Sequence, residues 1–275
     1  MTGKVIACIG DGGNDVAMIQ KADVGLGIVG KEGMQASLAA DFSVLKFSDI
    51  KKLIIWHGRL SYKRSASLSQ FVVHRGMIIS FIQAIFTCLY FFVTIPIYNG
   101  YLILGYSTIY TSFPVFSLVL DVDVSYTQVA RFPALYKTIQ KGRSLNTKTF
   151  LIWTWKSIYQ AAIIMFVAVT QFDQSFVNIV TITFSCLICI EMLNVLSEVT
   201  KVHKLMVASI LLTLAMYVGS IALFRQYFQV SYIDGPFLLK VTLLTLVTWL
   251  PLEAFKKIMG KCDPSQEQKI MQEAA

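Results

Sequence analysis

The feature that most constrains this chain is a run of 45 residues, 76–120, that contains no Asp, Glu, Lys or Arg. A helix that crosses the hydrocarbon core of a bilayer needs about 20 apolar residues. The run is therefore long enough for two crossings, and Pro96, Asn99 and Gly100 supply a turn between them. This stretch predicts a pair of membrane-spanning helices.

Similar apolar stretches downstream predict four more spans. Only 15% of the residues are charged, whereas about a quarter is usual in soluble proteins. We therefore expect a mainly α-helical membrane domain with six spans, at about 70–93, 101–120, 149–172, 174–197, 204–224 and 235–255.

The charges of the connecting loops predict the orientation of the spans. The loops at 94–100, 171–176 and 225–236 together hold one basic residue, Arg225. The loops at 121–148 and 198–204 and the C-terminal tail are rich in basic residues: Arg131, Lys137, Lys141, Arg143, Lys148, Lys201, Lys204, Lys256, Lys257, Lys261 and Lys269. Because cytoplasmic loops carry the excess of Lys and Arg, both termini are expected in the cytoplasm. The net charge of +8 fits this distribution, and no nucleic-acid-binding motif is present.

The first 47 residues have the pattern of a soluble α/β domain. Apolar stretches at 5–9 and 24–29 predict strands, and 42–47 predicts a third strand or an extended edge. Asn14 and Asp15 are candidate N-caps for a helix that runs through Gln20, and 32–40 predicts a second helix. Three strands leave exposed sheet edges, so we expect residues 1–47 to be a piece of a larger domain. Residues 48–75 predict a basic helix that leads into the first span.

The turn between the first strand and helix carries the residues with the clearest chemistry. Glycines at 10, 12 and 13 let the backbone approach an anion, while Asp11 and Asp15 offer carboxylates with Asn14 between them. Mg²⁺ favours one or two carboxylates together with phosphate oxygens. A lone Gly-Asp-Gly turn is as often a simple capping turn, but the longer string Gly-Asp-Gly-Gly-Asn-Asp is more specific. These residues predict a Mg²⁺-phosphate site.

The string at 10–15 resembles the last signature of the haloacid-dehalogenase phosphotransfer fold, a Rossmann-like α/β fold, in the form that P-type ATPases use. Most of the remaining chain resembles the carboxyl-terminal quarter of the type IV branch, the phospholipid flippases. The blocks that carry this resemblance are HGRLSYKRS at 57–65, YTSFP at 110–114, DVDV at 121–124, PALYK at 133–137 and GRSLNTKTF at 142–150. HRG at 74–76, with FPVFSLVLDVD at 113–123, is most similar to the Neo1-type branch of Golgi and endosomal membranes.

This resemblance implies a division of the chain and a set of roles. It implies the end of a cytoplasmic phosphorylation domain (1–47), a stalk helix (48–75), a membrane domain (76–257) and a cytoplasmic tail (258–275). It also implies that Asp11 ligates Mg²⁺, that Asp15 assists, and that Asn14 orients the phosphate. The implied activity is ATP-driven movement of phospholipid from the exoplasmic to the cytoplasmic leaflet; which lipid moves, and whether an accessory subunit is needed, stay open.

Other parts of the P-type machinery are missing from this sequence. There is no Asp-Lys-Thr-Gly-Thr motif, and hence no aspartate to phosphorylate, and no nucleotide-binding domain. We therefore expect the chain to be a fragment that works with the remaining N-terminal part of the same ATPase. Alone, it should not hydrolyse ATP.

Polar residues in and beside the first two spans predict a lipid path. Arg75 stands at the edge of the uncharged run, and its planar guanidinium suits a lipid phosphate, although a basic residue there can also be a simple interface anchor. Tyr110, Thr111 and Pro114 combine hydroxyls with a backbone carbonyl that the proline frees. Glu191 is costly inside a span, and a helix-interface hydrogen bond or a protonated acid is its simplest role.

Two other functions remain open at this point. One is a cation-transporting P-type pump, which the lack of carboxylates inside the second span disfavours, because Asp121 and Asp123 fall at its end. The other is a non-catalytic membrane protein with a vestigial phosphotransfer loop, which the intact string at 10–15 disfavours mildly.

Overall fold

The computed structural model describes residues 4–30, 34–132, 134–137, 139, 144–171, 176–223, 235–262 and 269. It divides into two compact units, Met1–Leu60 with Ser125–Tyr136, and Ser61–Val124 with Lys137–Ala275. Each unit is described by itself. Several sequence features lie outside the described residues, among them Pro133, Gly142, Arg143, the loops at 172–175 and 224–234, and most of the tail beyond Cys262.

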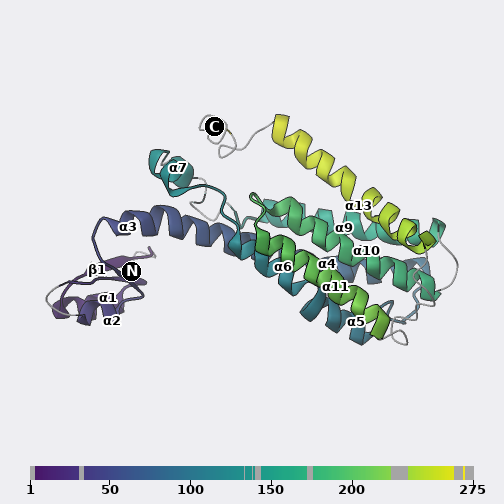
Figure 1. Ribbon diagram of the computed structural model, residues 1–275, viewed down its shortest axis with the longest axis horizontal. Helices are drawn as coiled ribbons and strands as arrows, with labels where there is room; N and C mark the ends of the chain where they lie inside the picture. Colours follow the sequence, from purple (N-terminus) through teal and green to yellow (C-terminus); the bar gives the residue numbers. More distant parts are fainter. Residues whose placement is uncertain are drawn as a thin grey trace. The chain divides into compact units, whose positions relative to one another are not determined.

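The first unit contains a small parallel sheet with strand order β1-β2-β3: β1 (Ala7–Gly10), β2 (Val24–Ile28) and β3 (Phe42–Val44). Parallel neighbours need crossover connections, and α1 (Val16–Lys21) and α2 (Gln35–Ala39) provide them. The two helices lie side by side along the sheet (Figure 1). The predicted strands and helices form at the predicted places, with ends that differ by one to three residues; β1 and α1 end one residue later than predicted, and β2, α2 and β3 are shorter than predicted.

The same unit includes the start of a long helical segment, most of which belongs to the second unit. A short helix, α3 (Asp49–Lys52), runs through a π-helical turn, η2 (Leu53–Gly58), into α4 (Arg59–Leu89). A separate helix, α7 (Tyr126–Arg131), packs on η2, where the rings of Trp56 and Tyr126 lie 6.3 Å apart. A short α8 (Ala134–Lys137) follows it. Within the first unit, residues 126–131 from the sequence between the second and third spans thus pack on residues 53–58.

The chain is mainly helical, and in the described residues six helices are long and apolar enough to cross a membrane: Asp49–Leu89, Gly100–Leu120, Thr147–Thr170, Phe176–Glu198, Lys204–Leu223 and Gly235–Cys262. The number and order of the predicted long apolar helices are confirmed. Four of the six are α9 (Thr147–Gln171), α10 (Phe176–Glu198), α11 (Lys204–Leu223) and α13 (Gly235–Cys262) (Figure 1). The first span ends at Leu89 rather than near residue 93, where Phe91 and Phe92 adopt positive φ angles.

The second span is irregular. It consists of α5 (Gly100–Gly105), the π-helical turn η3 (Tyr106–Tyr110), α6 (Ser112–Ser117) and the 3₁₀ turn η4 (Leu118–Leu120). Thr111 and Ser112 each hydrogen-bond the carbonyl five residues earlier, at 2.6 and 3.1 Å. Pro114 cannot donate a backbone hydrogen bond, so the carbonyl of Tyr110 loses its helical partner. The proline and the two hydroxyls together explain why the regular hydrogen-bond ladder breaks here.

The core of the second unit lies around α10. This helix is 78% buried across its most apolar window, whereas the other five candidate spans are 22–50% buried. Phe184, Leu187 and Ile190 of α10 belong to one apolar cluster with Ile78 of α4 and Tyr217 of α11. A helix surrounded in this way places any polar side chain it carries inside protein rather than against lipid.

Candidate functional site

The chain holds two groups of candidate functional residues, one in each unit. The first is the turn between β1 and α1. The carboxylate of Asp15 folds back over this turn, where its Oδ2 accepts hydrogen bonds from the amides of Asp11 at 3.1 Å and Gly12 at 3.3 Å. A Cβ on Gly10 would lie 2.3 Å from the Cβ of Asp15. The glycine is therefore required for the carboxylate to occupy this position.

This geometry confirms one of the two N-cap candidates by position, without the expected capping bond. Asp15 stands at the N-cap position of α1, but its side chain makes no capping hydrogen bond to that helix, and Asn14 lies in the 3₁₀ turn η1 (Gly13–Asp15) before it. The Asp15 carboxylate instead accepts hydrogen bonds from the amides of Asp11 and Gly12, which precede the helix. Asp15 consequently shapes the turn before the helix.

Asp11 and Asn14 leave oxygens available at the same turn. Both residues are exposed, and among the described residues the Asp11 carboxylate has no hydrogen-bond or ion-pair partner. No group of three or more His, Cys, Asp or Glu side chains that could hold a metal occurs in the described part of the chain. Asp11, with the second oxygen of Asp15, fits Mg²⁺, which binds through one or two carboxylates and takes its other ligands from phosphate and water.

The second group is a buried polar cluster in the membrane unit. It draws side chains from four of the candidate spans: His74, Arg75, Tyr106, Thr111, Ser157, Gln160, Glu191 and Asn194. Six of these, all but Arg75 and Tyr106, are polar or charged residues with 1% or less of their surface exposed. Buried polar groups are costly unless they are hydrogen-bonded, so the pattern of bonds defines the site.

His74 is the centre of one half of the cluster. Ser157 donates its hydroxyl proton to the carbonyl of Trp153 at 2.9 Å, so its oxygen accepts from Nδ1–H of His74 at 2.6 Å. The other ring nitrogen, Nε2, accepts from the amide of Asn194 at 3.2 Å. Asn194 and Gln160 exchange two hydrogen bonds, each 3.2 Å long. This pattern assigns one proton to the imidazole, on Nδ1.

Glu191 and Tyr106 form the second half. Glu191 is fully buried, and its Oε1 lies 3.1 Å from the hydroxyl of Tyr106. The same hydroxyl lies 3.3 Å from the backbone carbonyl of Arg75. His74 Nε2 lies 4.0 Å from Glu191 Oε1, too far for a hydrogen bond. The two halves are neighbours, but no direct hydrogen bond joins His74 to Glu191.

Arg75 crosses from the first span to the second. Its Nη1 donates to Thr111 Oγ1 at 2.6 Å and to the carbonyl of Ser107 at 3.3 Å. No ion pair to Arg75 is present among the described residues. The rest of its guanidinium fork thus remains available to an anion or to water.

Two of the four predicted lipid-path residues, Arg75 and Thr111, are brought into direct contact. Tyr110 turns away and donates to Ser220 of α11 at 2.7 Å, and Pro114 is buried within α6. Sequence reasoning missed Ser157, Gln160 and Asn194. Their signal was available, because an amide side chain inside an apolar span is unusual and needs a polar partner.

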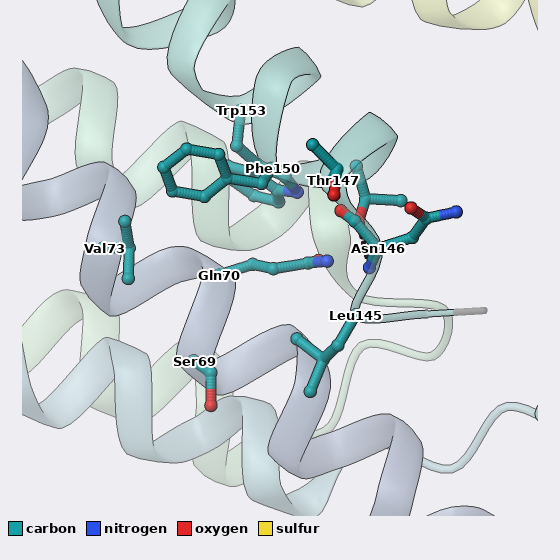
Figure 2. Close-up of a pocket in the computed structure, with 9 residues that line it drawn as sticks. Ser69, Gln70, Val73, Leu145, Asn146, Thr147, Phe150 and Trp153 are labelled. Carbon is teal, nitrogen blue, oxygen red and sulfur yellow. Dashed lines mark hydrogen bonds between the residues drawn. The ribbon is translucent and has the colours of Figure 1, made fainter. Parts of the chain in front are cut away.

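A pocket lies beside this cluster, between α4 and the start of α9. Its volume is about 330 Å³. The wall is largely apolar, and Figure 2 shows the Gln70 side chain reaching toward the loop that carries Leu145 and Asn146. Gln70 donates to the carbonyl of Ser144 at 2.7 Å. The lining residues are Ser69, Gln70, Val73, Leu145, Asn146, Thr147, Thr149, Phe150 and Trp153.

Comparison with known proteins extends over nearly the whole chain. Residues 37–256 match the family described as phospholipid-translocating P-type ATPase C-terminal. The probable phospholipid-transporting ATPase IIB of Danio rerio is 53% identical over 263 residues, which are 95% of this chain and 23% of that protein. The human protein of the same name is 49% identical over 281 residues, which cover 98% of this chain and 24% of that protein.

A more distant relative, the phospholipid-transporting ATPase NEO1 of Saccharomyces cerevisiae, is 42% identical over 276 residues, 99% of this chain and 24% of that protein. The chain thus spans about a quarter of the length of the curated relatives it matches.

Proposed function

We propose, from the premise that this chain belongs to the family of phospholipid-translocating P-type ATPases, that it forms the carboxyl-terminal part of an ATP-driven lipid flippase. The full protein would move phospholipid from the exoplasmic to the cytoplasmic leaflet. The observation that carries this proposal is the family match over residues 37–256. It includes the first five candidate spans in full and the sixth, Gly235–Cys262, as far as residue 256.

The first unit would contribute to phosphoryl transfer. In this proposal residues 1–47 are the end of a haloacid-dehalogenase-like phosphorylation domain, and the parallel order of β1, β2 and β3 supports it. Asp11, with Asp15, would hold Mg²⁺, which neutralises charge on a phosphoryl group when bound. Asp15 also fixes the amides of Asp11 and Gly12, and so holds the turn in shape, while the exposed Asn14 would orient the phosphate. The phosphorylated aspartate and the main ATP site would come from the N-terminal part of the same protein.

The second unit would provide the lipid path. Arg75 is held against the irregular second span by Thr111, and its fork suits bidentate contact with a lipid phosphate. The described residues of the second span, 100–120, include no carboxylate that could bind a cation. This supports lipid over metal ions as the transported species. Tyr110 and Pro114 would act by shaping the second span.

Location and topology complete the proposal. The loop charges support six spans with both termini in the cytoplasm, which puts the Asp11 turn on the side where ATP is found. The resemblance of residues 74–76 and 113–123 to the Neo1-type branch is the ground for proposing a Golgi or endosomal membrane. The stalk at 48–75 and the tail at 258–275 would both lie on the cytoplasmic side.

Reconstitution of the full-length protein tests the proposal. Vesicles would contain a fluorescent phospholipid, and a membrane-impermeant quencher would report how much of it remains in the outer leaflet. ATP with Mg²⁺ should move the lipid in the wild-type protein and not in Asp11→Asn, which keeps the shape of the side chain but removes its charge. Uptake of a metal ion driven by ATP, without movement of any lipid, would contradict the proposal.

A further inference from the structure

Glu191 has too few hydrogen-bond donors around it for an ionised carboxylate. The side chain is fully buried, and its Oε2 has no hydrogen-bond partner among the described residues. Among the residues that the structure describes, the only donor at its Oε1 is the hydroxyl of Tyr106, at 3.1 Å. A buried carboxylate normally needs several donors or an opposite charge, because it has left water.

The hydroxyl of Tyr106 has one proton and faces two acceptors. These are Glu191 Oε1 at 3.1 Å and the carbonyl of Arg75 at 3.3 Å. If Glu191 were ionised, that single proton would have to serve both oxygens. If Glu191 carries a proton on Oε1, it donates to Tyr106, and Tyr106 donates onward to Arg75. With the protonated acid both hydrogen bonds of this chain have a donor, whereas with the carboxylate one of them lacks a donor. In the protonated state only Oε2, a neutral carbonyl oxygen, has no hydrogen-bond partner among the described residues.

The basic groups that face Glu191 are each engaged elsewhere. On α4, His74 carries its proton on Nδ1 and accepts from Asn194 at Nε2, so it presents no N–H to the acid 4.0 Å away. Arg75 donates to Thr111 and to the carbonyl of Ser107.

On α9, Lys156 lies 3.6 Å from Glu198 and over the ring of Trp153, with its ammonium 4.5 Å from the ring centre. Among the described residues, neither Arg75 nor Lys156 forms a hydrogen bond or ion pair with Glu191. None of the three supplies the hydrogen bond that a carboxylate would require.

We infer that Glu191 is a proton-binding site, occupied in this arrangement and emptied when Tyr106 moves away from it during the transport cycle. On release, the O–H bond of the Glu191 carboxyl breaks, its electron pair stays on the oxygen, and the proton passes to a water molecule that enters the bundle. On return, the carboxylate takes a proton from water and restores the bond to Tyr106. This inference goes beyond lipid transport, because it adds a proton to what the membrane unit binds.

The irregular second span gives a physical reason for Tyr106 to move. Tyr106 begins the π-helical turn η3, in which one extra residue is accommodated relative to an α-helix. A shift of that extra residue along the chain rotates the side chains it passes, whereas Glu191 sits on the regular and buried helix α10. The partner of the acid can therefore leave while the acid stays in place.

Infrared difference spectroscopy of the full-length ATPase tests the inference. ATP released by light from a caged precursor would start the cycle in reconstituted protein. The wild-type spectrum should show a change in a carboxylic acid C=O band, which shifts in deuterated water. Glu191→Gln, which keeps the size and hydrogen-bonding capacity of the protonated acid, should lose that band. The control Glu198→Gln should keep it, because Glu198 pairs with Lys156 and Lys256 and makes no hydrogen bond to Tyr106 or Glu191 among the described residues.

Several results would overturn the inference. These are the absence of any acid band in the wild-type difference spectrum, or a band that survives in Glu191→Gln. If Glu191→Gln does not fold, Tyr106→Phe decides the question, since it keeps the acid and removes its partner. The acid band should then move to higher frequency, as expected for a C=O group whose hydroxyl has lost its hydrogen bond. An unchanged band in Tyr106→Phe would refute the assignment to Glu191.

Discussion

The contact between Arg75 and Thr111 can be tested by a double-mutant cycle in the full-length protein. Arg75→Lys keeps the charge but loses the planar fork, and Thr111→Val removes the oxygen that accepts from Nη1 at 2.6 Å. A hydrogen bond to a charged group contributes about 1.5–3 kcal/mol in soluble proteins. Interhelical hydrogen bonds in membranes average about 0.6 kcal/mol and reach about 1.7 kcal/mol. The short distance and the charge place this bond near the upper membrane value, at about 1.5 kcal/mol.

That free energy corresponds to about a tenfold change in rate if the contact is needed in the rate-limiting arrangement. We therefore expect each single substitution to slow ATP-driven uptake of labelled lipid about tenfold, and the double mutant to be no slower than the slower single mutant. Phosphoenzyme formation from ATP should persist, because the first unit is unchanged. Thr108→Val is the matched control, since it makes the same kind of substitution in the same span and removes a hydroxyl that donates to the carbonyl of Leu104 at 2.7 Å, whereas Arg75 donates to Thr111 and to the carbonyl of Ser107.

Two results would refute this reasoning. Normal uptake in Arg75→Lys would show that Arg75 is an interface anchor, for which any cation suffices. A double mutant whose loss equals the product of the two single losses would show that the two residues act independently.

Three further predictions concern other parts of the chain. Asp11→Asn in the full-length protein should greatly slow phosphoenzyme formation, and normal levels at low Mg²⁺ would show that Asp11 only shapes the turn. Asn194→Leu removes three buried hydrogen bonds, worth together about 2 kcal/mol at the membrane average, and should lower the temperature at which the detergent-solubilised protein aggregates. Thr170→Val, which removes one hydroxyl at an exposed position of α9, should change that temperature much less. Glycosylation acceptors near Asn99 should be modified and those near Gln140, outside the described residues, should not; modification near Gln140 would contradict cytoplasmic termini.

The six spans could be predicted from the sequence because the thickness of a bilayer sets a length that apolar stretches must reach. The strand, turn and helix around residues 4–21 were equally predictable, since glycine-rich turns interrupt apolar runs wherever they occur. The expected family was also confirmed by comparison. These features depend on neighbours in the sequence or on the membrane itself, so no knowledge of tertiary contacts was needed.

The turn at Asp11 shows where local reasoning stops. The residue types predicted a Mg²⁺-phosphate site, and that prediction stands as a proposal. The sequence could not show that one carboxylate oxygen of Asp15 accepts hydrogen bonds from the amides of Asp11 and Gly12. That choice depends on the path of the backbone through the turn, which the absence of a side chain at Gly10 permits.

The buried cluster was decided by tertiary structure alone. Tyr106 and Glu191 are 85 residues apart, and His74 and Asn194 are 120 apart, so no local pattern relates them. Which side chains meet depends on how each helix is rotated about its axis, and apolar spans with polar residues on several sides leave that rotation undetermined. In the second span the π-helical turn changes the rotation again, which sends Tyr110 toward Ser220 and leaves Thr111 to meet Arg75. The sequence determined how many helices cross the membrane, and packing around α10 determined which of their polar groups face one another.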